Sequence, residues 1–217
     1  MASTMLHYTI SNLILREIQV SDRERFLLGA SMGPDASSHD DGSYVTAHYI
    51  KRNSDETSKG VVWTDFSKQY DKTILSDDFV LGYYCHLIMD AVWLHDMSNK
   101  YVRCYQGEER NKAYQRGYRD YDLLNYLLIR EYSLKSVKFS ETDTPVSEIS
   151  EERLVRVKSF FEQCFNQNPC KKEDLDIYKW VTIQDYIKKS TALCVSEIKA
   201  LRNGLTGLNP EELYVNI

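Results

Sequence analysis

The chain has 217 residues, of which 42% are hydrophobic and 12% aromatic, and its formal net charge is −5. This composition can bury a sizeable core, and we expect residues 1–217 to form a single domain. The acidic balance and the lack of a large Lys or Arg block argue against a nucleic-acid duplex as partner. The first residues lack a basic region followed by an apolar run, so no signal peptide is expected. The five scattered cysteines contain no Cys-x2-Cys pair, which excludes a zinc finger and favours a cytoplasmic protein with reduced thiols.

Apolar residues recur at intervals of three and four along most of the chain, which predicts helices. In chain order, the predicted helices cover residues 4–18, 21–28, 61–70, 79–97, 108–132 (one helix or two abutting ones), 151–166 and 183–205. Glycines at 29 and 33 with Pro34 are expected to end the second helix. Residues 29–59 are expected to be irregular, and 133–149 to be a linker. No run of period-two alternation indicates a strand, so the predicted fold class is all-α.

The most apolar long stretch, residues 79–97, carries His86 and Asp90 in its middle. Four residues apart on a helix, these two side chains lie on the same face. Two His and two Asp make the stretch a poor membrane span, so no stable membrane anchor is expected. Burying an imidazole beside a carboxylate is costly unless hydrogen bonds or a metal ion compensate. A lone pair of this kind is more often structural than metal-binding.

All the histidines lie in the first 95 residues, at positions 7, 39, 48, 86 and 95. Three segments could therefore converge on one site: the segment with His7, the loop with Asp35 and His48, and the stretch with His86 and Asp90. Imidazole and carboxylate groups are ligands of zinc and related divalent ions. Taken alone, this distribution leaves a metal site and a set of core histidines about equally open.

The order of these residues resembles the zinc-dependent phospholipase C family. The resemblance is carried by the histidine near the N-terminus, Gly29-Ala30 before Pro34-Asp35, the Ala47-His48 pair, and Phe-x-Leu-Gly-Tyr-x2-His-Leu-x2-Asp-x2-Trp over residues 79–93. More narrowly, the chain is similar to a small bacterial intracellular branch described as phospholipase-C-like. The family shares its all-helical fold with zinc-dependent single-strand nucleases. The resemblance covers residues 1 to about 130. Residues 1–132 are expected to form the half with the metal site, and residues 133–217 to complete the helical packing.

The resemblance also implies a set of metal ligands. One zinc ion would be held by Asp35, His48, His86 and Asp90, and Asp90 could bridge to a second ion that His7 also binds. In the family a third ion uses later histidines that this chain lacks, so the three-metal centre is incomplete. Carboxylates bind zinc too, and the candidates for additional ligands are His95, Asp96, Asp120 and Asp122.

The residues outside this set have simpler interpretations. In its polar loop, His39 is expected to be exposed to solvent, and His95 suits the C-terminal end of a helix. The tyrosine-rich helix is expected to be part of the core, although rings near a metal site could also bind the apolar part of a ligand.

The activity implied by the resemblance is zinc-dependent hydrolysis of a small phosphoester. A zinc ion with an open position lowers the pKa of bound water towards about 7, and Asp35 would act as both ligand and general base. The alternative is a non-catalytic helical protein in which one structural or vestigial zinc supports a binding or scaffold role. If no metal binds, His86 and Asp90 should be hydrogen-bonded only to each other and to the backbone.

Overall fold

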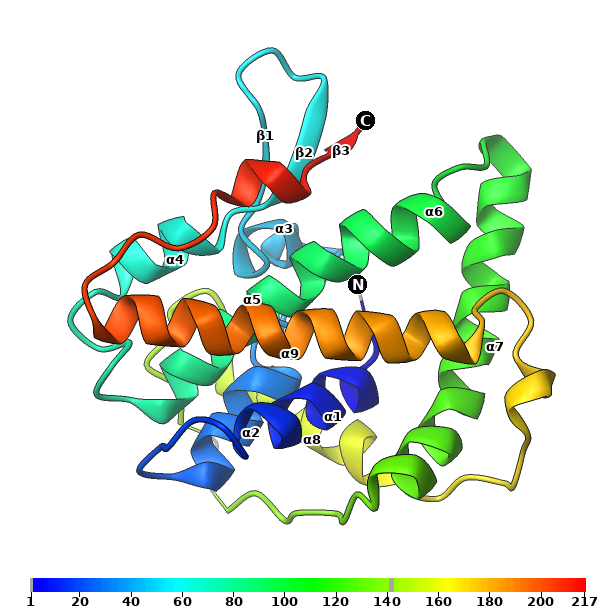
Figure 1. Ribbon diagram of the computed structural model, residues 1–217, viewed down its shortest axis with the longest axis horizontal. Coiled ribbons are helices and arrows are strands. Elements are labelled where there is room, and N and C mark those ends of the chain that lie inside the picture. Colours follow the sequence, from blue (N-terminus) through cyan, green and yellow to red (C-terminus); the bar gives the residue numbers. More distant parts are fainter. Residues whose placement is uncertain (1, 141–142) are drawn as a thin grey trace.

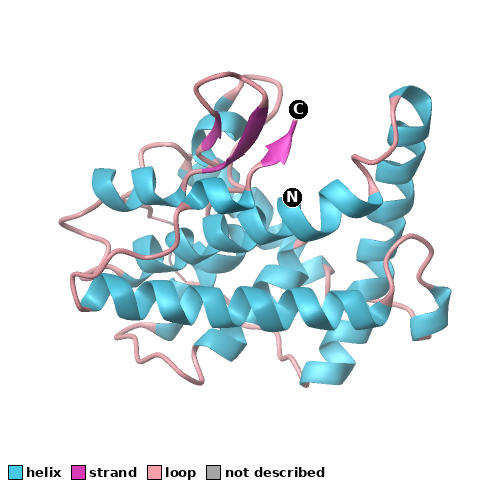
Figure 2. Ribbon diagram, turned by 45° about the horizontal axis from the view of Figure 1, so that its top comes forward, coloured by secondary structure: helices cyan, strands magenta, loops and turns pink. Residues whose placement is uncertain are grey.

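The computed structural model describes residues 2–140 and 143–217, so Met1 and residues 141–142 of the predicted linker lie outside the described residues. The chain is mainly helical, as predicted, and carries one small sheet (Figures 1 and 2). Its elements are, in chain order, α1 (Thr4–Ile14), α2 (Arg23–Met32), α3 (Ser43–Ala47), β1 (Ile50–Arg52), β2 (Ser58–Val61), α4 (Trp63–Gln69), α5 (Asp78–Val92), a π-helical turn (Trp93–Ser98), α6 (Asn99–Tyr101), α7 (Gly107–Tyr132), α8 (Glu151–Gln163), a 3-10 turn (Lys172–Asp174), α9 (Trp180–Arg202), a 3-10 turn (Pro210–Leu213) and β3 (Val215–Asn216).

Helix α5 lies at the centre of the fold. It begins after Asp77, whose side chain accepts hydrogen bonds from the backbone N–H groups of Phe79 and Val80 at 2.8 and 3.4 Å. Helices α1, α2, α4 and α9 all pack against it, and its residues from Phe79 to Val92 are buried. In Figure 1, α9 runs across the front of the molecule with α1 and α2 below it. The surrounding helices therefore shield almost the whole circumference of α5 from solvent.

The predicted end of the second helix at residue 28 is wrong, because α2 continues through Gly29. A Cβ atom on Gly29 would lie 2.1 Å from the carbonyl oxygen of Phe79, and one on Gly82 would lie 2.2 Å from that of Phe26. These glycines are needed because α2 and α5 cross at backbone contact distance. A glycine that serves helix packing looks the same in the sequence as one that ends a helix.

Strand β1 and the first half of β2 lie where irregular structure was predicted, and with β3 they form a three-stranded antiparallel sheet. Strand β1 pairs with β2 from Ile50–Val61 to Arg52–Lys59, and β2 pairs with β3 at the C-terminal end (Figure 2). The strands contain three, four and two residues, which is too short for alternation to show in the sequence. Helix α3 also forms inside the region expected to be irregular.

Two predicted helix starts are confirmed by their caps. The side-chain oxygen of Ser3 accepts from the N–H of Leu6 at 3.4 Å, and that of Ser150 accepts from the N–H of Arg153 at 3.2 Å. Residues 107–132 form one helix, which settles the choice between one and two.

The stretch 79–97 changes to a π-helical turn after Val92; such turns are rare and often occur at functional sites.

The hydrophobic core runs through the whole structure, from Met5 in α1 to Phe161 in α8, Ile198 in α9 and Leu213 near the C-terminus. All five cysteines are free thiols. Among the helices formed by residues 2–140 and 143–217, none combines the length and the apolar character that a membrane crossing requires.

Candidate metal centre

Four segments bring five titratable side chains to one place inside the fold. His7 comes from α1, Asp35 from the loop after α2, His48 from the residue that follows α3, and His86 and Asp90 from α5. The three histidines and Asp90 are completely buried, whereas 25% of the Asp35 side chain is exposed. The structure thus gathers every ligand that the sequence predicted for the main site.

These residues form two overlapping groups, Asp35 with His48 and His86, and His7 with His86 and Asp90, whose ligand atoms lie within 4.8 Å of one another. Asp90 connects the groups. Its Oδ2 atom lies 3.2 Å from Nε2 of His86 and 3.5 Å from Nε2 of His48. Its Oδ1 atom lies 3.2 Å from Nε2 of His7. Asp35 completes the arrangement, with Oδ1 at 3.4 Å from Nε2 of His48 and 3.9 Å from Nε2 of His86.

Backbone carbonyl groups fix the orientation of two imidazole rings. Nδ1 of His86 lies 3.1 Å from the carbonyl oxygen of Ala30, and Nδ1 of His48 lies 3.0 Å from that of Tyr44. Because a carbonyl oxygen can only accept, Nδ1 must carry the proton in both rings. In the neutral form, each Nε2 therefore directs a lone pair at the carboxylates, which is how metal-binding histidines are usually oriented.

Several of the converging atoms have no hydrogen-bond partner among the described residues. They are Nε2 of His48 and His86, Oδ2 of Asp90, and both ring nitrogens of His7. His86 and Asp90 are close, but the two groups are not aligned as a hydrogen bond. Buried polar atoms without partners are uncommon and costly. Lone pairs that face carboxylate oxygens repel one another unless a proton or a cation lies between them.

The charge state of the two carboxyl groups suits a cation. Burial alone would raise the pKa of Asp90, but the positive charge that the rings of His86 and His7 carry in their protonated form outweighs it and holds this pKa well below its ordinary value. Burial also acts to raise the pKa of Asp35, and the rings of His48 and His86 lower it below its usual value. Both groups are therefore carboxylates at neutral pH, the form that binds metal ions.

Contacts around the centre hold the segments that carry these side chains. The backbone N–H of Ala2 donates to Oδ1 of Asp90 at 3.1 Å, which ties the start of α1 to α5. The hydroxyl group of Tyr83, on α5, donates to the carbonyl oxygen of Ala47 at 2.6 Å and so fixes the end of α3. The centre is therefore assembled by tertiary contacts between elements far apart in the sequence.

A pocket of about 370 Å³ opens beside the centre. Its walls include Asp35, His39, Tyr44 of α3, Tyr118 of α7 and Phe160 of α8. Asp35 is the only described residue of the two groups that lines it, so the pocket meets the centre at this carboxylate. No lysine or arginine is found among the described lining residues.

The pocket contains functional candidates that the sequence did not indicate. His39 is exposed, as predicted, but its ring also stacks on that of Tyr44 with 3.7 Å between centroids. Tyr44 in turn stacks on His48 at 4.0 Å. Tyr118 was expected in the core, yet 64% of it is exposed at the pocket. Only the position of Tyr44, four residues before His48, offered a local signal that it lies beside the centre.

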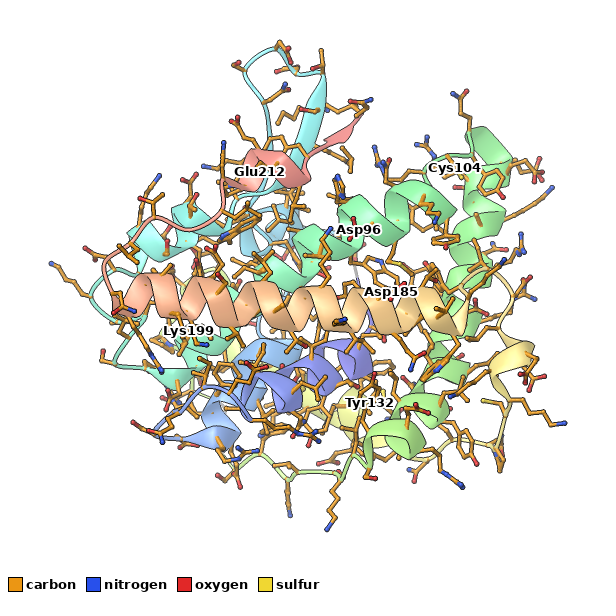
Figure 3. The ribbon with its side chains drawn as sticks, viewed as in Figure 1. Asp96, Cys104, Tyr132, Asp185, Lys199 and Glu212 are labelled. Carbon is orange, nitrogen blue, oxygen red and sulfur yellow. The ribbon has the colours of Figure 1, made fainter. Side chains whose placement is uncertain are left out.

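Two of the additional candidates lie away from the centre. Nδ1 of His95 is 2.6 Å from Oδ1 of Asp96, and Oδ2 of Asp96 accepts from Nζ of Lys189 at 2.6 Å. Asp96, from the π-helical turn, and Asp185, from α9, line a separate small pocket between these elements (Figure 3). His95 and Asp96 belong to neither of the two groups that could hold a metal ion.

The carboxylates of α7 have different environments. Asp122 lines the main pocket but joins neither group. Asp120 is buried and accepts hydrogen bonds from three successive backbone N–H groups, residues 176–178, at 2.8–2.9 Å. Asp120 therefore anchors the segment before α9. Residues 2–140 and 143–217 contain no third group of metal-ligating side chains.

Fold and centre together define a mainly helical protein with a buried His and Asp cluster beside a pocket. Comparison with known proteins finds no matching family model, no matching curated protein and no matching solved structure. The resemblance to zinc-dependent phospholipase C enzymes thus rests on the sequence motifs.

Proposed function

We propose that the protein is a zinc-dependent hydrolase of a small phosphoester, similar in kind to the zinc-dependent phospholipase C family. One observation carries the proposal. The Nε2 atoms of His48 and His86, without hydrogen-bond partners among the described residues, converge with Oδ2 of Asp90 on one point beside a pocket that is open to Asp35.

The donor atoms fit a zinc ion in type and in spacing. Two imidazole nitrogens and two carboxylate oxygens are ordinary zinc ligands, with bonds of about 2.0–2.2 Å. In a regular tetrahedron, bonds of this length place neighbouring ligand atoms about 3.3–3.6 Å apart. The contacts of Asp35, His48, His86 and Asp90 span 3.2–3.9 Å. His7, beside the other oxygen of Asp90, would hold a second ion.

In the proposed reaction, water attacks the phosphorus atom and the bond to the leaving oxygen breaks. Zinc, when bound, would polarise the phosphoryl oxygen and make water a better nucleophile. Asp35 would accept the proton of the attacking water, because it is ionised and is the member of the centre that reaches the pocket. The leaving oxygen would keep the bonding electrons and take up a proton from solvent.

The pocket lining supports a substrate with little negative charge beyond one phosphate group. No lysine or arginine among the described lining residues would neutralise further phosphates, and Asp122 would repel them. The rings of Tyr44, Tyr118 and Phe160 offer apolar surface to the organic part of the ester.

The alternative is a structural zinc in a binding or scaffold protein. It is favoured by the complete burial of four of the five side chains. It predicts a closed coordination shell without exchangeable water.

The test compares hydrolysis of 4-nitrophenyl phosphate and bis(4-nitrophenyl) phosphate by the zinc-loaded wild type, Asp35→Asn and Asp96→Asn. We expect wild-type hydrolysis of at least one ester, a loss of about 100-fold or more in Asp35→Asn, and no change in Asp96→Asn. Zinc content is measured on the same samples. If the zinc-loaded wild type hydrolyses neither ester, the structural alternative replaces this proposal.

A further inference from the structure

The residue that follows His48 has an unusual backbone conformation. Tyr49 has φ of +49°, in the left-handed region that glycine favours. For a residue with a Cβ atom, this conformation is strained. Residues held in this way persist only when their surroundings enforce the conformation. The contacts of Tyr49 therefore bear on the adjacent metal ligand.

Tyr49 lies in the tight turn that joins α3 to β1. Its N–H bonds to the carbonyl oxygen of Thr46 at 3.0 Å, and its own carbonyl oxygen accepts from the N–H of Val62 at 2.9 Å. Helix α3 has only five residues, so it has little stability of its own. The direction in which the chain leaves His48 depends on this turn.

The side chain of Tyr49 is 8% exposed and anchored by a distant carboxylate. Its hydroxyl group donates to Oε1 of Glu148 at 2.5 Å, and Nε2 of Gln69 donates to the same oxygen at 2.7 Å. The ring packs edge-on against Phe66, with 5.4 Å between centroids. The hydroxyl group of Tyr70 donates to the other oxygen of Glu148. Glu148 thus reaches from the connection between α7 and α8 to the residue beside His48.

We propose that Glu148, acting through the hydroxyl group of Tyr49, is a positioning residue for His48 in the metal centre. The hydrogen bond holds Tyr49 in the left-handed turn, and the turn holds the end of α3. With the turn fixed, Nε2 of His48 stays 3.4 Å from Asp35 and 3.5 Å from Asp90. This inference rests on the zinc site of the proposed function, and Glu148 itself touches neither metal nor substrate.

The test uses two variants that each delete one phenol bond to the same carboxylate. Tyr49→Phe removes the bond next to His48 together with the contact of the same hydroxyl group to Oε1 of Gln69 at 2.9 Å. Tyr70→Phe, the matched control, removes the bond to the other oxygen of Glu148 together with the bond from the N–H of Ser147 at 3.0 Å. Zinc dissociation constants are measured by competition with a chromophoric chelator, and unfolding of the metal-free proteins by urea. We expect Tyr49→Phe and Glu148→Ala to bind zinc about 10–100-fold more weakly, as for other residues that orient metal ligands. We expect the zinc dissociation constant of Tyr70→Phe to stay within threefold of wild type, although its free energy of unfolding should fall about as much as that of Tyr49→Phe.

The outcomes separate the inference from the proposed function. If Tyr49→Phe binds zinc as tightly as the wild type, or if both phenol deletions weaken zinc equally, Glu148 has only a structural role and the inference is wrong. The zinc site itself would stand in either case. A wild type that binds no zinc would overturn the proposed function and this inference together.

Discussion

The close crossing of α2 and α5 makes Gly82→Ala an informative substitution. Its new Cβ atom would lie 2.2 Å from the carbonyl oxygen of Phe26 and 2.8 Å from the backbone nitrogen of Ala30. Both are backbone atoms, so no side-chain rotation relieves the clash. Helix α2 would have to withdraw by roughly 1 Å to reach an ordinary contact of 3.4 Å. The same movement would stretch the hydrogen bond from His86 to Ala30, now 3.1 Å, beyond bonding distance.

Three contributions determine how much Gly82→Ala lowers the free energy of unfolding. Overpacking costs about 1–3 kcal/mol, and a buried hydrogen bond left unmade costs about 1–3 kcal/mol. Alanine stabilises a helix by about 1 kcal/mol relative to glycine, which offsets part of this loss. We expect a net loss of about 3 kcal/mol in the free energy of unfolding. Because the His86 ring loses the carbonyl that orients it, zinc binding should also weaken by about 10-fold or more.

Urea unfolding of the metal-free protein and chelator competition for zinc measure the two effects. Gly117→Ala, in helix α7, is the matched control, since the nearest atoms to its Cβ atom would all belong to the Tyr178 side chain, with the hydroxyl oxygen at 3.0 Å and two ring carbons at 3.5 Å. The control should lie within about 1 kcal/mol of wild type and bind zinc normally. Wild-type stability and zinc affinity in Gly82→Ala would refute the argument that this crossing fixes His86.

Three further predictions concern stability. Zinc at 100 times its dissociation constant should stabilise the wild type by about 2.7 kcal/mol, measured as a zinc-dependent rise in Tm that EDTA reverses. Asp120→Ala should lower the free energy of urea unfolding by about 2–4 kcal/mol, because three buried N–H groups lose their acceptor, and should leave zinc affinity unchanged. Burial acts to raise the pKa of Glu148, but hydrogen bonds from Tyr49 and Tyr70 outweigh it and lower this pKa. The stability that Glu148 contributes is thus complete above its unfolded-state pKa of about 4.3 and is lost as the pH falls. The gap between wild type and Glu148→Gln in urea titrations should therefore narrow from pH 6 to pH 3, and a constant gap would contradict this.

The sequence was informative where one residue type has one dominant role. The apolar stretch around His86 predicted the central helix, because an almost uninterrupted apolar circumference has to be buried. The helix starts predicted at residues 4 and 151 follow Ser3 and Ser150, whose side chains cap the first turns, so a local signal was present there too. The five ligand candidates came from residue chemistry and from the family resemblance, and the fold brings them together.

The features that the sequence did not reveal depend on contacts between distant segments. Gly29 lies inside helix α2, and the position has to be glycine because the backbone of Phe79 leaves no space for a Cβ atom. Strand β2 is paired on one side with residues near the C-terminus, more than 150 positions away. Tyr49 has a left-handed backbone and its hydroxyl group donates to the distant Glu148, and no local pattern marks a tyrosine for such a turn. Local propensity is overridden at each of these positions by tertiary packing.

The central claim, that this centre binds zinc, is tested most directly by metal content. Plasma mass spectrometry would be applied to protein purified without a metal-affinity tag, comparing wild type with His86→Ala and Asp90→Ala. Both residues contribute to the contacts at the middle of the cluster. We predict near-stoichiometric zinc or more in the wild type and its loss in both variants. A wild type that stays metal-free after zinc has been supplied would contradict the account.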